Sequence, residues 1–156
     1  MKNYIGKYLG KETSYLDNEE GYLSLLPKSN WHCLLIANED FNKEKINEFA
    51  LKAFTQDILG IRSQGKYGNM LDACISILRT DLELDKINND IDVSIYGDGQ
   101  SALIDAFWEC FGAPVLPNRT NWDSLILVCI SFDSRSYENE LRRFLKMFND
   151  GWLPNS

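Results

Sequence analysis

Short apolar runs alternate with amphipathic stretches from residue 31 onward. The run from Trp31 to Ala37 is apolar at nearly every position, which is typical of a strand buried on both faces of a sheet. Beyond Asn42, a suitable N-cap, apolar residues recur at the i, i+3, i+4, i+7 and i+8 spacing of one helical stripe. The stripe consists of Ile46, Phe49, Ala50, Ala53 and Phe54. The pattern therefore predicts a strand followed by a helix.

The same pair of elements recurs three more times along the chain. Strands are predicted at Asp57 to Ser63, Asp92 to Tyr96 and Ser124 to Phe132. Each of these strands is followed by a stretch with helical periodicity. Four strand-then-helix units in succession predict a three-layer α/β domain, with four main, mostly parallel strands and helices on both faces of the sheet.

Two of the helices have predicted caps and apolar faces. Asn69 is the candidate N-cap of the second helix, and Ser134 or Ser136 of the fourth. The predicted apolar face of the second helix comprises Met70, Ala73, Cys74, Ile77 and Leu78. That of the fourth comprises Tyr137, Leu141, Phe144, Leu145 and Phe148.

The first thirty residues lack a clear periodicity. They are rich in Tyr, Gly and acidic residues, and they predict an irregular N-terminal arm packed on the domain, with a short strand around Tyr22 to Leu26 as its one regular piece. No linker divides the rest, so we expect a single domain over residues 1–156. The strand order is not readable from the residues; a 2-1-3-4 type of order, numbering the four predicted strands along the chain, is the prior for doubly wound folds.

Composition narrows the class of function. With 156 residues, 44% of them hydrophobic, the chain is long enough to bury a core. Its net charge of −7 argues against a general binder of nucleic acid or anionic membranes, because phosphates are held by basic faces. The N-terminus lacks the apolar core of a signal peptide, which favours a cytoplasmic protein. The cysteines Cys33, Cys74, Cys110 and Cys129 are widely spaced and are expected to be reduced core residues.

One loop has the glycine spacing of a nucleotide-binding turn. Gly97, Gly99 and Ala102 form G-x-G-x-x-A between a predicted strand and a predicted helix. However, Asp98 would place a carboxylate beside the pyrophosphate, and the acid at the end of the next strand, Asp133, follows Gly97 by 36 positions instead of about 20. We therefore favour a strand-to-helix turn in which Asp98 caps a helix beginning at Gly99, and we expect no cofactor.

A metal site is the alternative reading of the acidic loops. In a parallel sheet the loops that follow the strands meet at one edge, so carboxylates there could converge on Mg²⁺ for phosphoryl transfer or phosphate hydrolysis. The candidate ligands are Glu39, Asp40, Asp98 and Asp133, with Lys66 or Arg135 to neutralise a phosphate. Capping alone would also place acids at these helix starts. Serine catalysis lacks a base, because the single histidine, His32, lies in a strand predicted to be buried.

Negative charge is concentrated between residues 81 and 98, where six acids accompany one base, Lys86. Exposed aromatic residues bordered by charge suit a protein interface. The alternative is a solvated loop whose charge only keeps the protein soluble. The candidate partner-binding residues are Asp81, Glu83, Asp85, Asp90, Asp92, Asp98 and Trp122.

In size, acidity and layout, from "NWHCLLIANEDF" to "ENELRRFLKMF", the chain resembles bacterial immunity proteins, small inhibitors that neutralise a cognate toxin. The resemblance implies binding without catalysis. Acidic and aromatic residues would cover the active site of a basic toxin, often a nuclease.

Overall fold

A six-stranded sheet forms the centre of the molecule. The structure is a computed structural model that describes residues 2–81, 91–112 and 115–154. Within these residues the strand order is β1-β2-β6-β3-β4-β5, and only β1 runs antiparallel to its neighbour. The strands are β1 (Asn3–Tyr8), β2 (Lys11–Asp17), β3 (Trp31–Ile36), β4 (Ile58–Gln64), β5 (Asp92–Tyr96) and β6 (Ile126–Ser131).

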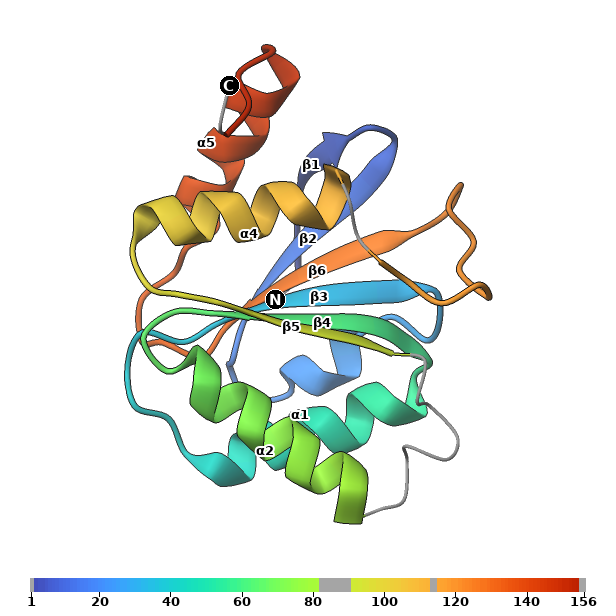
Figure 1. The fold of residues 1–156 in the computed structure, drawn as a ribbon, viewed down its shortest axis with the longest axis vertical. Helices are drawn as coiled ribbons and strands as arrows, with labels where there is room; N and C mark the ends of the chain where they lie inside the picture. The colour runs from blue at the N-terminus through green and yellow to red at the C-terminus, as the bar shows by residue number, and fades with distance from the viewer. Residues whose placement is uncertain (1, 82–90, 113–114, 155–156) are drawn as a thin grey trace.

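Helices cover both faces of the sheet, which confirms the three-layer α/β class. The helices are η1 (Tyr22–Leu25), α1 (Lys43–Thr55), α2 (Gly68–Asp81), α4 (Gln100–Gly112) and α5 (Glu138–Asn149). Helices α1 and α2 lie on one face, and α4 and α5 on the other (Figure 1). Among the described residues, no helix is long and apolar enough to cross a membrane.

The N-terminal segment is not an irregular arm, so that prediction was wrong. It forms the β1–β2 hairpin, and β2 lies inside the sheet between β1 and β6. Its buried positions include the polar Thr13 and Ser14 beside Tyr15 and Leu16, so hydropathy gave no strand pattern. Residues 22–25, where a short strand was expected, form a 3₁₀-helix.

The four strands predicted from sequence lie in the order 4-1-2-3, as β6-β3-β4-β5, and the 2-1-3-4 prior was wrong. The strand order follows from which face of the sheet each helix covers. Helices α1 and α2 share one face, so right-handed crossovers carry the chain in one direction from β3 to β4 to β5. Helix α4 crosses the opposite face and returns the chain to β6, beside β3. The chain therefore reverses direction between β3 and β6, which makes this point the topological switch of the sheet.

Helix α1 follows the sequence prediction closely, and α2 does not. The Asn42 side chain accepts the N–H of Glu44 at 2.9 Å as the N-cap of α1. Helix α2 begins at Gly68, one residue before the predicted cap, and it buries Leu71 and Ile75. Ile77, predicted to be in the core, is 62% exposed. Cys74 and Leu78 of the predicted face are partly buried against the core, so the buried face of α2 lies to one side of the predicted one.

Helix α5 buries the predicted face, with Leu141, Phe144, Leu145 and Phe148 against the sheet and the preceding Tyr137 buried beside them. Tyr137 occupies the N-cap position, and Ser136 Oγ accepts the N–H of Glu138 at 3.2 Å.

Each face of the sheet has its own apolar core. Alternate residues of β3 point to opposite faces, so Cys33 and Leu35 pack under α1 and α2 while Leu34 and Ile36 pack under α4 and α5. All four cysteines are free, and only Cys74 is less than fully buried. Burial raises the pKa values of Cys33, Cys110 and Cys129, so these thiols stay protonated.

Candidate functional site

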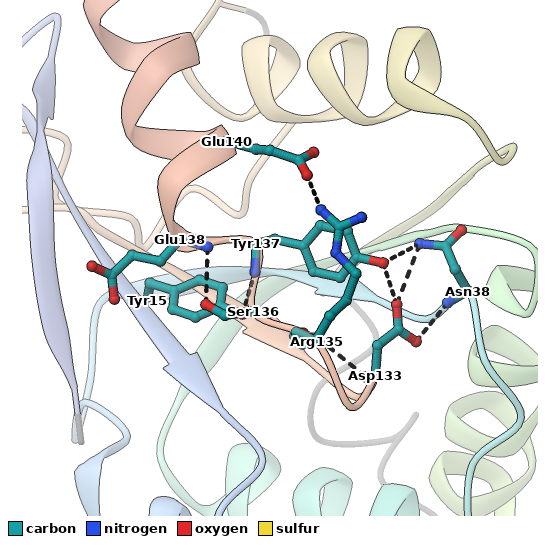
Figure 2. Close-up of polar contacts among 9 residues, drawn as sticks. Tyr15, Asn38, Asp133, Arg135, Ser136, Tyr137, Glu138 and Glu140 are labelled. Atoms are coloured by element: carbon teal, nitrogen blue, oxygen red, sulfur yellow. Dashed lines mark hydrogen bonds and ion pairs between the residues drawn. The ribbon is translucent and has the colours of Figure 1, made fainter.

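The carboxylate of Asp133 ties the loop after β6 to the loop after β3, across the topological switch. Its Oδ1 accepts the backbone N–H of Asn38 at 2.8 Å and of Glu39 at 2.9 Å. Its Oδ2 accepts the Asn38 side-chain amide at 3.4 Å and the Tyr137 hydroxyl (Figure 2). Asp133 is only 5% exposed. Hydrogen bonds within the protein therefore join the two loops at the switch point, where an open α/β sheet usually binds its ligand. The hydrogen bonds between Asp133 and its partners Asn38, Glu39 and Tyr137 are called the clamp below.

Tyr137 links this clamp to the β1–β2 hairpin and to the surface. Its N–H donates to the Tyr15 hydroxyl at 2.9 Å, and that hydroxyl donates to Asp17 Oδ1 at 2.7 Å. The Arg135 side chain lies beside the Tyr137 ring (Figure 2), and its guanidinium carbon is 4.3 Å from the ring centroid. Burial, and the bond to Asp133, raise the pKa of Tyr137 to about 12. The tyrosine therefore remains a hydrogen-bond donor at neutral pH.

Glu39 holds the other side of the same two loops together. Its carboxylate accepts the Ser134 backbone N–H at 2.8 Å and the Ser134 hydroxyl at 2.6 Å. These bonds lower the pKa of Glu39. The ionised Glu39 carboxylate therefore joins the loops after β3 and β6.

The four acids of the metal hypothesis do not form one cluster. Asp40 accepts the adjacent Phe41 N–H. Asp98 follows β5, which is three strand spacings, about 14 Å, from β6 and Asp133. Across residues 2–81, 91–112 and 115–154, no group of three or more His, Cys, Asp or Glu side chains could hold a metal ion. Glu39 and Asp133 are brought together, but they bind backbone and hydroxyl donors.

The G-x-G-x-x-A loop is a strand-to-helix turn, as expected, but its cap differs. Gly99 has φ +95°, and its carbonyl accepts the N–H of Leu103, so it occupies the N-cap position and α4 begins at Gln100. Asp98 is exposed and accepts no hydrogen bond from the helix within the described residues, so the predicted Asp98 cap was wrong. Gly97 anchors the turn, because its carbonyl accepts the Gln64 amide at 2.9 Å and the Gly65 N–H at 3.2 Å.

A pocket of about 500 Å³ opens beside the clamp, between the N-terminal ends of α4 and α5. Residues from five segments line it, among them Gln64, Gly99, Leu103, Tyr137, Glu140 and Arg143. Arg135 also lines it, and its guanidinium forms an ion pair with Glu140 (Figure 2).

Three of the candidate partner-binding acids lie in the described residues, two of them at the ends of β5. Asp92 is its first residue, Asp98 follows its end, and Asp81 is the last residue of α2. Asp92 also pairs with the buried Arg62 guanidinium at 3.8 Å. Glu83, Asp85 and Asp90 lie outside the described residues.

Trp122 does not join these acids. It is 47% exposed in the loop that precedes β6, with Lys11 Nζ 5.4 Å from its ring centroid. Strands β3 and β4 separate β6 from β5. The candidate interface therefore divides into an acidic edge at β5 and a separate aromatic residue.

Sequence reasoning places Gln64 among the residues at the end of a strand but gives it no role, and it missed the pocket residues Glu140 and Arg143. The rule that ligands bind beyond the carboxyl ends of strands does select the loops after β3, β4, β5 and β6. Arg143 gave no such signal, because its place on a helix face depends on how α5 lies against α4.

A comparison of the chain with protein-family models, with curated proteins and with solved structures finds no match.

Proposed function

We propose that the chain is a non-catalytic, acidic protein-binding module that binds a basic protein through the β5 edge of its sheet. An immunity protein, which neutralises a toxin by covering its active site, is the form of this function that we favour. The acidic character of an open sheet edge carries the proposal.

Strand β5 offers backbone groups to a partner. It pairs with β4 on one side, and no strand among the described residues pairs with its other side. Ile95 is 45% exposed on this strand. An open edge presents unpaired N–H and C=O groups, which a partner's strand or loop can bind.

The acids around β5 supply the charge preference. Asp92 lies at the start of the strand, and Asp98 is exposed just after its end. Asp81 is exposed at the end of α2, the helix that precedes β5 in the sequence. Negative charge at an edge discourages pairing with a second copy of the same acidic chain. It also speeds association with a basic partner, since opposite charges steer the encounter.

Internal bonding of the reactive groups supports binding over catalysis. Asp133 and Glu39 bind donors within the protein, and Tyr137 donates to Asp133. His32 is fully buried in β3, where burial and the charges of Arg62 and Lys11 lower its pKa to about 3. A base with these properties neither reaches a substrate nor takes a proton at neutral pH.

The test is an association-rate measurement on a purified pair. A partner is captured from the source cells at low salt, identified, and recombined with the full chain from pure components. We expect one-to-one binding that weakens with added salt, and loss of the partner's toxic or nuclease activity in the complex. Substituting Asp81→Lys and Asp98→Lys together should slow association by about tenfold.

The control is a double variant with the same change of charge. Glu12→Lys with Glu20→Lys alters exposed acids in and after β2, on the far side of β6, β3 and β4. Asp92 is left intact because it balances the buried Arg62. Equal slowing by both double variants would show that net charge alone governs association, and would overturn the assignment to the β5 edge.

A further inference from the structure

We propose that the pocket between α4 and α5 binds a phosphomonoester, a small molecule that carries a terminal phosphate. This site adjoins the end of β5, since Gly99 follows Asp98, but it is lined by other residues than those of the proposed interface, and it adds a ligand to the proposed function. Its argument begins with charge. In a chain of net charge −7, the pocket lining contains two arginines, Arg135 and Arg143, against one acid, Glu140.

The two arginines differ in how they are held. Arg135 is fixed by its ion pair with Glu140 and by the Tyr137 ring beneath it. Arg143 lies over the Phe144 ring and contacts the Met147 sulfur at 3.9 Å, and it has no carboxylate partner in the described part of the chain. Its guanidinium charge is thus not balanced by a neighbouring acid, and a phosphate would balance it.

The start of α4 adds a second attraction for an anion at the same pocket. The first N–H groups of a helix have no partner within it, and the helix dipole makes this end positive. Gly99 and Gln100 line the pocket, and the space where a Gly99 side chain would begin is open. Asp98, the acid just before this turn, is exposed and is not among the residues that line the pocket, so an anion in the pocket can approach the backbone of Gly99 and Gln100 closely.

Gln64 provides an independent sign that a ligand belongs here. This residue is 1% exposed and lines the pocket. Its Nε2 donates to Gly97, which fixes the amide orientation, and its Oε1 has no hydrogen-bond partner among the described residues. A buried acceptor without a donor is unfavourable, so a ligand that brings a hydroxyl or N–H to Oε1 gains from it.

The size of the pocket indicates more than a bare ion. Its volume of about 500 Å³ is within the range of pockets for small organic ligands. Leu103 and Tyr137 supply apolar and aromatic lining, and Gln64 supplies the acceptor for a hydroxyl. A phosphate on the arginines with a hydroxylated body toward Gln64 matches each of these features.

Calorimetric titration of the full chain tests the ligand class. Ribose 5-phosphate is the probe, with inorganic phosphate and unphosphorylated ribose as the comparison arms. We expect ribose 5-phosphate to bind more tightly than inorganic phosphate, and ribose to give no binding. If ribose 5-phosphate gives neither heat nor a rise in melting temperature at about 10 mM, the proposal is wrong, because a bound ligand must stabilise the folded state.

Two neighbouring arginines on α5 give a matched test of the site. Arg143→Gln should weaken ribose 5-phosphate by about tenfold or more, since it removes a charged donor. Arg142→Gln makes the same charge change at a residue that bonds Glu138 and the Tyr4 carbonyl instead, and should leave affinity unchanged. Glu140→Gln should tighten binding, because it removes the one acid of the lining. Equal affinities for the Arg142 and Arg143 variants would place the phosphate elsewhere and overturn the proposal.

Discussion

The Asp133 side chain occupies the switch point between β3 and β6, where a ligand binds in many α/β proteins. Its two oxygens accept donors from Asn38, Glu39 and Tyr137, and these residues come from both sides of the switch between β3 and β6. Buried carboxylates are retained when such donors satisfy them. The open space at this edge is consequently shifted sideways, into the pocket between α4 and α5.

His32 makes stability depend on pH. Its two ring nitrogens are buried without a hydrogen-bond partner among the described residues. Burial, then the charges of Arg62 and Lys11, lower its pKa from 6.5 to about 3. Below pH 6.5, the His32 side chain binds a proton in the unfolded chain but stays neutral in the folded chain. The contribution of His32 is therefore complete above pH 6.5 and is lost as the pH falls toward 3, by up to about 1.4 kcal/mol per pH unit.

Replacing His32→Leu should remove this dependence. We expect the free energy of unfolding of the variant to fall less steeply between pH 6.5 and 4.5 than that of the original chain, as measured by urea unfolding at several pH values. Near pH 7 the two should be similar, because an apolar side chain of similar size replaces a neutral, unsatisfied one. Parallel curves across this pH range would contradict the assignment.

The turn between β4 and α2 joins three strands through one glycine. The Gly65 N–H donates to the Gly97 carbonyl after β5, and Gly65 has φ +117°. A Cβ on Gly65 would lie 2.3 Å from the carbonyl oxygen of Ala37, which follows β3. The carboxyl ends of β3, β4 and β5 can therefore approach each other only with glycine at this position.

Substituting Gly65→Ala should cost about 3 kcal/mol or more of unfolding free energy, because backbone must move to admit the methyl group. Gly10→Ala is the matched control: Gly10 also has positive φ, at +76°, but nothing lies within 4 Å of its added Cβ. We expect it to cost about 1 kcal/mol from backbone strain alone. Denaturant unfolding of the two variants measures the difference, and equal losses would refute the close approach at Gly65.

Elements with strong periodicity were predictable from the sequence, and those stabilised by neighbours were not. The continuous apolar run of β3 and the single stripe of α1 gave their positions directly. Strand β2 gave no signal, because Thr13 and Ser14 are buried through pairing with β1 and β6 and not through their own hydropathy.

The site depended on strand order, which no local pattern encodes. The loops were identified correctly as those after the strands, but Asn38 and Asp133 are 95 positions apart in sequence. Their contact exists because β6 returns beside β3. Without that adjacency, four acids in three loops suggested a common cluster, whereas the sheet separates Asp98 from Asp133.

At the scale of the whole molecule, aromatic packing joins both ends of the chain. Phe148 of α5 contacts the rings of Tyr8 in β1 and of Phe107, Trp108 and Phe111 in α4. The Asn149 side chain also donates to the Lys7 carbonyl. The hairpin, α4 and α5 are therefore packed against one another and should unfold together.

Substituting Phe148→Ala should lower the stability of the whole domain by about 3–5 kcal/mol, as expected for a buried aromatic residue. Tryptophan fluorescence and far-ultraviolet circular dichroism should shift to the same lower denaturant midpoint. The control is Phe41→Ala, since Phe41 is half-buried and its one ring contact among the described residues is with Tyr67. Separate midpoints for the two signals would mean that the layers unfold independently.

The place of β2 within the sheet has a consequence for how the protein is made. Glu12 pairs with Ile126, 114 positions later in the chain. At a synthesis rate of about 5–20 residues per second, the hairpin leaves the ribosome roughly 10 s before the strand that covers it. Throughout that interval Tyr15 and Leu16, which are fully buried in the finished fold, have no β6 to pack beside. The nascent chain therefore exposes the apolar side chains of β2 for most of its translation. A chaperone that binds the first seventeen residues should raise the yield of folded protein.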